Sequence, residues 1–172
     1  GASDPLRSLR GRPARVTRVF LLAGAVVALD QITKAIALPR LSLSVPVSLV
    51  DNLLALTLVM NPGLAFGLLG GLPKAWRWVV AVVSLVALVV LVRVALRVVP
   101  AGGRMGAVAI GLVFGGAVGN LIDRARFGAV VDFVDVHWHA WHWPAFNVAD
   151  SAITVGVALL AFQMLRAPSP SR

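Results

Sequence analysis

The sequence contains no cysteine and no glutamate among its 172 residues, and only 13% of its residues are charged. Without cysteine, disulfides, thiolate metal sites and a cysteine nucleophile are all excluded. Without glutamate, the HExxH motif of zinc metalloproteases is excluded as well. Soluble domains carry roughly 25% charged residues, whereas 59% of this chain is apolar. A chain with so few charges cannot cover a water-soluble surface, so the composition indicates a membrane protein.

The few charges are mostly basic, with 16 Lys and Arg against 7 acidic residues and a net charge of +9. This sign fits the basic cytoplasmic ends of a polytopic membrane protein better than nucleic-acid binding, and we expect no nucleic-acid partner. Each carboxylate is informative because so apolar a chain contains so few of them. The acidic residues are Asp4, Asp30, Asp51, Asp123, Asp132, Asp135 and Asp150.

Four segments are long and apolar enough to cross a membrane, which takes about 20 residues. They cover residues 16–38, 76–99, 105–122 and 148–165. Asp30 and Lys34 interrupt the first segment and no small-residue cleavage site follows it, so it does not read as a signal peptide. We expect a single four-helix transmembrane domain over residues 16–166, with a disordered basic tail at 1–15 and a second tail at 167–172.

Lys and Arg are distributed unequally on the two sides of these spans, with ten on the side of the termini and six on the other. Because cytoplasmic loops carry the excess of basic residues, both termini should be cytoplasmic. The connecting segments 39–74 and 123–147 then lie outside.

Each outer segment has a recognisable pattern. Apolar residues alternate over 43–60 with a break at Asp51-Asn52, which predicts a pair of strands at the membrane surface. The second outer segment is rich in tryptophan, which suits the aromatic belt of a membrane interface. These residues are Trp138, Trp141 and Trp143. The expected fold class is therefore an all-α membrane protein of four transmembrane helices with a small extracytoplasmic β-sheet.

Several polar residues lie at helical spacing near the outer ends of the spans. Asp30 and Lys34 are four residues apart, so they share a helix face and should form a structural ion pair. Asn120 and Arg124 share a face for the same reason. Asn61 begins an Asn-Pro-Gly sequence, which is a turn signal.

Two isolated carboxylates stand out among these polar groups. Asp150 follows Asn147 with the spacing of a capping box at the start of the fourth span. Asp132 lies among apolar residues on the same side of the membrane. Two converging carboxylates cannot both ionise, so one becomes an acid and the other a base, and such a pair can activate water and polarise a peptide carbonyl. An aspartic hydrolase therefore fits this chain, and it needs neither a metal nor a cofactor.

A zinc site is one alternative to this chemistry. His137, His139 and His142 resemble metal ligands. Asp132 or Asp135 would complete such a site. An interfacial segment of Trp and His is the simpler interpretation of the same residues, and we expect no metal.

Two further alternatives remain open. Ser151 with Lys34 would make a Ser-Lys membrane hydrolase, although a hydroxyl is ordinary in the first turn of a helix. A small polytopic transporter would place charges along a path across the bilayer. The acidic residues gather at one side instead, which favours the hydrolase.

Five motifs follow one another along the chain, each beside an expected span. They are DQITK, NPGLAFG, GGAVGNLIDR, VVDFVDV and WPAFNVADS. Together they resemble the bacterial lipoprotein signal peptidase family, signal peptidase II, over residues 16–165. The resemblance implies a four-helix aspartic endopeptidase of the bacterial inner membrane. Such an enzyme removes signal peptides from prolipoproteins by cutting just before a cysteine that carries a diacylglyceryl group.

The resemblance also implies roles for individual residues. The catalytic pair falls on Asp132 and Asp150. The residues that bind substrate or support the pair are Asn61, Asn120, Arg124, Asn147, Asp30 and Lys34. It further implies a mobile external lid over 127–144, an active site near the outer surface, and inhibition by globomycin-type cyclic peptides. We expect the protein to act as a monomer in contact with membrane lipid.

Overall fold

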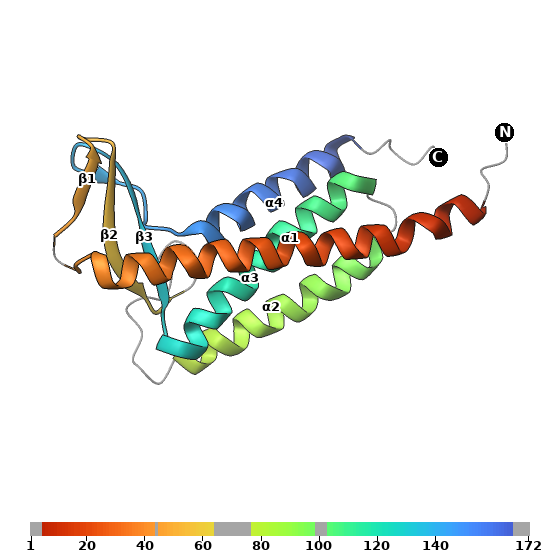
Figure 1. The fold of residues 1–172 in the computed structure, drawn as a ribbon, viewed down its shortest axis with the longest axis horizontal. Helices are drawn as coiled ribbons and strands as arrows, with labels where there is room; N and C mark the ends of the chain where they lie inside the picture. The colour runs from red at the N-terminus through yellow and green to blue at the C-terminus, as the bar shows by residue number, and fades with distance from the viewer. Residues whose placement is uncertain (1–4, 44, 64–76, 99–102, 167–172) are drawn as a thin grey trace.

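The computed structural model describes residues 5–43, 45–63, 77–98 and 103–166. The helices lie side by side in an elongated bundle, and the sheet lies at one end of it (Figure 1). The first turn of α1 and the last turn of α4 are both at the opposite end. The elements are α1 (Pro5–Arg40), β1 (Val47–Val50), β2 (Leu54–Asn61), α2 (Arg77–Val98), α3 (Gly103–Phe127), β3 (Val130–Trp138), β4 (Trp141–His142) and α4 (Val148–Arg166).

Three helices are long and apolar enough to cross a membrane, judged over the described residues. They are Arg15–Arg40 of α1, α3 and α4. These helices contain the predicted spans 16–38, 105–122 and 148–165. The last of these matches α4 to within one residue at each end. The remaining prediction, 76–99, coincides with helix α2, which packs against α3.

Helix α1 begins at Pro5, within the segment 1–15 that the sequence predicts to be a tail. Proline suits the first helical position, where its fixed φ is helical and its missing N–H leaves no bond unmade. Residues 5–15 extend the helix of the apolar span that follows them. Residues 1–4 and the second predicted tail, 167–172, lie outside the described part of the chain.

Helix α3 is the centre of the bundle. Half of the residues in its most apolar stretch are buried, compared with 22% for α1 and 11% for α4. Small residues make this possible because they let neighbouring backbones approach closely. A Cβ at Gly115 would meet Ala23 of α1, and one at Gly116 would meet the carbonyl oxygen of Ala149 in α4. The glycines predicted to serve packing therefore bring both α1 and α4 close to the backbone of α3.

The four strands form one antiparallel sheet in the order β1-β2-β3-β4. The expected strand pair is confirmed as β1 and β2, although β1 begins only at Val47. The break at Asp51-Asn52 is the turn between them, where Asn52 takes a left-handed φ of 60°. Asparagine tolerates this conformation better than most residues.

The segment predicted as an external lid, 127–144, contains β3 and β4 and extends the sheet. Strand β3 pairs with β2 from Val130 to Val136, with Val130 opposite Asn61 and Asp132 opposite Val59. This pairing joins residues about 70 positions apart in the chain. It also brings the Asn-Pro-Gly turn to the same end of the sheet as Asp132, where β3 leaves α3.

Candidate active site

Asp132 and Asp150 come from different elements and share a hydrogen-bonding neighbour, Asn147. Asp132 lies near the start of β3 and is 1% exposed, and Asp150 lies in the first turn of α4. The side-chain amide of Asn147 donates from Nδ2 to Asp132 Oδ1 at 2.7 Å. Its backbone N–H donates to Asp150 Oδ2 at 3.3 Å. One residue thus bonds to both carboxylates, so the two acids predicted to converge lie on either side of Asn147.

The orientation of the Asn147 amide is fixed by the start of α4. Asp150 donates its backbone N–H to Asn147 Oδ1 at 2.9 Å and accepts from the Asn147 backbone in return. This reciprocal pair is the predicted capping box. Because Oδ1 is used as the cap acceptor, Nδ2 must point the other way, toward Asp132. The helix cap therefore positions a donor for the second acid.

Asn120 of α3 is oriented in a similar way by Lys34. Lys34 Nζ donates to Asn120 Oδ1 at 3.2 Å, and Asn147 Nδ2 donates to the same oxygen at 3.2 Å. An ammonium group can only donate, so the amide oxygen must face it. Asn120 Nδ2 then faces Asp150 and donates to its Oδ1 at 2.8 Å.

The second side of Asp132 is held by the turn after β2. Asn61 Nδ2 donates to Asp132 Oδ2 at 3.0 Å, and Asn61 Oδ1 accepts from the Gly63 N–H at 3.0 Å. Arg124 Nη2 donates to the Gly63 carbonyl oxygen at 2.8 Å. Asn61 and Arg124, predicted from separate motifs, are therefore connected through one turn.

Asp30 and Lys34 form the predicted ion pair at 2.8 Å, and both are buried. Lys34 makes a second ion pair with the buried Asp123 of α3 at 2.6 Å. The two carboxylates also accept backbone N–H groups, Asp30 from Ala149 at 3.0 Å and Asp123 from Val131 at 3.1 Å. This buried network joins α1 and α3 to β3 and α4 directly beside the two acids.

Gln31 is a member of this network that the sequence reasoning missed. Its Nε2 donates to Asp123 Oδ1 at 2.9 Å and to the Gly119 carbonyl oxygen at 3.3 Å. Gln31 follows Asp30 directly, and adjacent residues do not share a helix face. Spacing alone therefore gave no signal that both residues contact α3.

Burial, and to a smaller extent the nearby charge of Asp150, together raise the pKa of Asp132 to about 7. The donors Asn61 and Asn147 oppose this shift because they stabilise the ionised carboxylate. Asp132 can therefore hold a proton near neutral pH. A carboxylic acid beside a second carboxyl group is an arrangement that supplies an acid and a base together.

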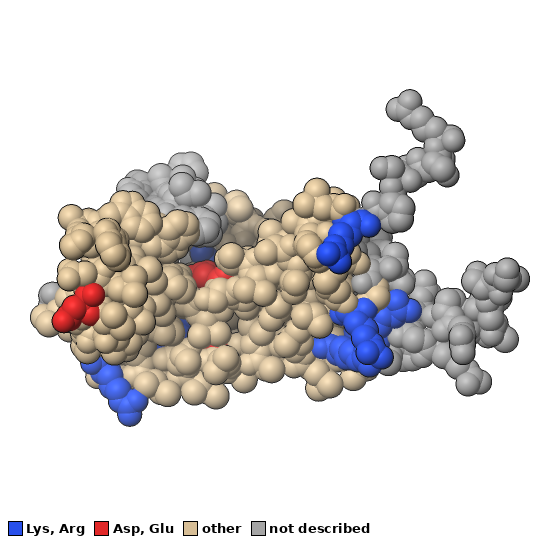
Figure 2. All heavy atoms as spheres, turned by 90° about the horizontal axis from the view of Figure 1, so that it is seen from above, with Lys and Arg blue, Asp and Glu red and all other residues tan. Residues whose placement is uncertain are grey.

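Two cavities meet at Asp150 and give this pair access to a ligand. One, of about 470 Å³, lies between α2, α3 and α4 and includes Asn61, Asn120 and Arg124 in its wall. The other, of about 390 Å³, lies between α4 and the segment that follows β4 and includes Phe146. Figure 2 shows acidic atoms at the floor of a hollow in the middle of one face of the molecule.

The geometry does not support the two alternative hydrolases. Ser151 Oγ donates to the Asn147 carbonyl oxygen at 3.1 Å, whereas Lys34 Nζ bonds to Asp30, Asp123 and Asn120. The nucleophile and base of a Ser-Lys pair are thus held by other partners. Asp132 does not belong to the one group of possible metal ligands found among the described residues.

Comparisons with known proteins agree with this geometry. The sequence profile of a family described as "Signal peptidase (SPase) II", Peptidase_A8, matches residues 22–166. The chain is 45% identical to the lipoprotein signal peptidase of Syntrophotalea carbinolica over 86% of this chain and 91% of that protein. It is 44% identical to the lipoprotein signal peptidase of Pseudomonas aeruginosa PAO1 over 82% of this chain and 83% of that protein.

A solved structure also has this fold. It is described as a bacterial membrane enzyme determined by the in meso method, and it superposes with a TM-score of 0.69 at 31% identity. The alignment covers 90% of this chain and 94% of the other. The sequence and the fold thus agree, and the protein is a multi-pass bacterial membrane protein. The chain belongs to the lipoprotein signal peptidase family, the aspartic peptidases of signal peptidase II type that remove signal peptides from prolipoproteins.

Proposed function

We propose that Asp132 and Asp150, which both accept a hydrogen bond from Asn147, are the catalytic pair of this peptidase and that the pair holds one proton at rest. The observation that carries this proposal is the pair of bonds from Asn147, 2.7 Å to Asp132 and 3.3 Å to Asp150. In this proposal Asp132 carries the proton at rest, because its pKa of about 7 allows it to stay neutral. Asp150 is the ionised partner, beside the N-terminus of α4, whose dipole favours negative charge.

The proposed reaction is hydrolysis of one peptide bond by an activated water molecule. Asp150 takes a proton from water while the water oxygen bonds to the carbonyl carbon, and Asp132 donates its proton to the carbonyl oxygen. Collapse of the tetrahedral intermediate breaks the C–N bond. The proton on Asp150 then passes to the leaving amine, and the carbonyl oxygen returns its proton to Asp132.

The remaining polar residues have positioning or substrate-binding roles in this proposal. Asn120 and Asn147 orient the two carboxyl groups. Asn61 supports Asp132 from the turn after β2. Arg124 binds the substrate backbone, and its Nε supports this role because it is buried and has no hydrogen-bond partner among the described residues. Asp30 and Lys34 form the ion-pair frame that holds α1 against α3.

We propose that the substrate is the signal-peptide end of a prolipoprotein whose next residue is a diacylglyceryl cysteine. The two cavities that meet at Asp150 support this proposal, because one can take the peptide and the other the acyl chains. Apolar residues of α2, such as Val83 and Leu88, form part of the first wall. Globomycin-type cyclic peptides would occupy the same space. Because a single chain contains all the proposed site residues, the proposed activity needs only a monomer.

We propose that α2 crosses the membrane as the fourth span and that both termini are cytoplasmic. Figure 2 shows Lys and Arg gathered at the end of the bundle opposite the sheet. Exposed basic residues on this side include Arg18, Arg93, Arg104 and Arg166. The sheet, with its exposed Trp138 and Trp141, then lies at the outer membrane surface. In this arrangement the active site faces the outside.

The proposal is tested by Asp132→Asn and Asp150→Asn, made one at a time. Each change removes either the acid or the base, so we expect cleavage of a lipidated prolipoprotein to fall by about 10²–10⁴-fold. The measurement is a gel-shift assay with purified enzyme. Asp51→Asn, in the exposed turn between β1 and β2, is the matched control and should cleave normally.

Ser151→Ala separates this mechanism from a serine hydrolase and should also leave cleavage intact. If either Asp132→Asn or Asp150→Asn folds and still cleaves at a near wild-type rate, the proposed pair is wrong. Folding is checked by circular dichroism and thermal unfolding of the same preparations.

A further inference from the structure

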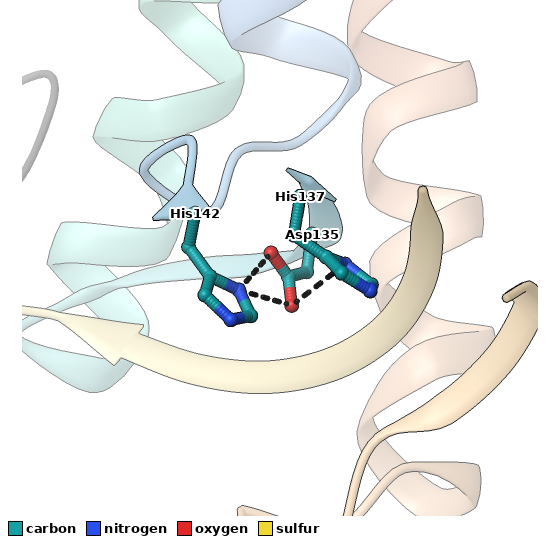
Figure 3. Close-up of side chains that lie close together, drawn as sticks. All are labelled: Asp135, His137 and His142. Atoms are coloured by element: carbon teal, nitrogen blue, oxygen red, sulfur yellow. Dashed lines mark hydrogen bonds and ion pairs between the residues drawn. The ribbon is translucent and has the colours of Figure 1, made fainter. Parts of the chain in front are cut away.

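A second polar cluster lies on the sheet, apart from the proposed catalytic pair. It consists of Asp135 and His137 of β3 and His142 of β4, and Figure 3 shows the Asp135 carboxylate between the two imidazole rings. The sheet itself explains why these residues meet. Asp135 and His137 are two positions apart on one strand, and His142 is directly opposite His137 in the antiparallel pair. All three side chains therefore lie on the same face.

Strand periodicity also separates this cluster from the active site. Asp132 and Asp135 are three positions apart on β3, so their side chains point to opposite faces. The register irregularity in this region adds its extra residue to β2 and leaves β3 regular. Asp132 accordingly bonds to Asn61 and Asn147, whereas Asp135 accepts from His142.

The spacing of the donor atoms in the cluster is that of ligands around a metal ion. His142 Nδ1 lies 3.0 and 3.1 Å from the two carboxylate oxygens of Asp135, and His137 Nδ1 lies 3.7 Å from one of them. The three ligand atoms all lie within 4.8 Å of one another. Zinc bonds to imidazole and carboxylate at about 2.0–2.2 Å, so neighbouring ligands of a tetrahedral site are about 3.3 Å apart. The imidazole-to-carboxylate distances of 3.0 and 3.7 Å bracket this value.

Burial leaves one nitrogen of this cluster, His137 Nδ1, without a hydrogen-bond partner among the described residues. Asp135 is buried as well. The His137 and His142 rings stack with centroids 4.9 Å apart, and both Nδ1 atoms lie near the Asp135 carboxylate. Burying a polar nitrogen without a partner is costly, and a bound cation would satisfy it. The His142 side chain is 55% exposed, which leaves an entry path.

Contrary to the expectation of no metal drawn from the sequence, we propose that Asp135, His137 and His142 bind one Zn²⁺ ion, with a water molecule in the fourth position. Two imidazoles and one carboxylate are a ligand set that zinc prefers. The ion would tie the two-residue strand β4 to β3, which is otherwise held there by few backbone bonds such as Trp143 N to Val136 O at 2.8 Å. It would have no part in peptide cleavage, because it lies on the other face of β3 from Asp132.

His139 provides a matched control on the same hairpin. It has the left-handed φ of 52° at the tip of the β3–β4 turn, is exposed and does not belong to the cluster. Its ring instead contacts Trp138, with centroids 5.3 Å apart. A binding site built by the cluster must need His137 and His142 but not His139.

The test is isothermal titration of Zn²⁺ into the full chain, purified in detergent with a tag that contains no histidine. We expect one ion per chain in the wild type and in His139→Ala. We expect His142→Ala, His137→Ala and Asp135→Asn to weaken binding by about 10-fold or more, in line with the loss of a metal-site residue. His142→Ala changes an exposed side chain, so it preserves the fold and keeps the test valid if the buried variants unfold.

Two controls define the site further. Asp132→Asn must still bind the ion, and the wild type must cleave a lipidated prolipoprotein equally well with and without EDTA. The proposal is overturned if the wild type binds no Zn²⁺ up to submillimolar concentration. It is equally overturned if His139→Ala weakens binding as much as His142→Ala does, or if Asp132→Asn abolishes binding.

Discussion

Asn147 and Asn120 are the residues that turn two separate acids into one site. Each has its amide oxygen facing a donor, the Asp150 backbone for Asn147 and the Lys34 ammonium for Asn120. Their Nδ2 groups are thereby directed at Asp132 and Asp150. The orientation of the proposed catalytic pair thus depends on a helix cap and on a buried ion pair.

The protonation of Asp132 predicts a pH dependence of cleavage. Its pKa is raised to about 7, so a mechanism that needs protonated Asp132 is active below this pH and loses activity as the pH rises through about 7. Asn61 stabilises the ionised form of Asp132, so Asn61→Leu should raise the pKa further. The alkaline limb of kcat/KM should then move to higher pH, whatever the change in maximal rate.

This prediction is checked by measuring kcat/KM from pH 5 to 9 for the wild type and Asn61→Leu. Ser48→Ala, in the exposed strand β1, serves as a control whose profile should match the wild type. An alkaline limb that stays at the same pH in Asn61→Leu, or moves to lower pH, would contradict the assignment of this limb to Asp132.

At the scale of elements, the close contact of α3 with α4 positions residues that support the proposed active site. A Cβ at Gly116 would collide with the carbonyl oxygen of Ala149, in the first turn of α4, which is also the turn that carries Asp150. Gly116→Ala should therefore destabilise the protein by about 1–3 kcal/mol, the usual range for overpacking. It should also lower cleavage by moving Asp150 away from Asn120.

The matched control for this change is Gly24→Ala in α1, where a Cβ has no other atom within 4 Å. Alanine is the better helix former, so this variant should be as stable as the wild type or slightly more stable. Thermal unfolding in detergent measures both changes. Equal unfolding temperatures for the two variants would show that the close packing of α3 on α4 does not support the site.

The helices could be predicted from sequence because the information is local. An apolar run and a capping box define α4, and the i,i+4 spacing of Asp30 and Lys34 correctly predicted their ion pair. Strand β3 was missed because its apolar run is interrupted by acids, and because its partner β2 lies about 70 residues away. Likewise, nothing local indicated that Asp123 would pair with Lys34 rather than lie at the surface.

At the scale of the whole molecule, the distribution of charge and aromatic residues indicates how the protein lies in the membrane. All the described carboxylates are in the half that carries the sheet, and basic residues gather at the other end (Figure 2). Trp138 and Trp141 are more than half exposed on the sheet, as expected for residues at a membrane interface. The proposed site is thus near the surface, where water can reach the peptide bond.

The proposed orientation is directly testable because the chain has no cysteine. Single cysteines are introduced as Ser48→Cys in β1 and Arg104→Cys at the start of α3, both at exposed positions. In intact spheroplasts a membrane-impermeant maleimide should label Ser48→Cys, and it should label Arg104→Cys only after permeabilisation. The reverse pattern, or labelling of both variants in intact spheroplasts, would contradict the orientation.

The coupling between the two acids is most directly tested by measuring the ionisation of Asp132 itself. Isotope-edited infrared spectroscopy of the carboxyl group gives its pKa in the wild type and in Asp150→Asn, in which the partner has no charge. We predict a pKa of about 7 in the wild type and a lower value in Asp150→Asn, because the charge of Asp150 raises it. An ordinary carboxyl pKa in the wild type, or the same value in both proteins, would contradict the account of one proton shared by Asp132 and Asp150.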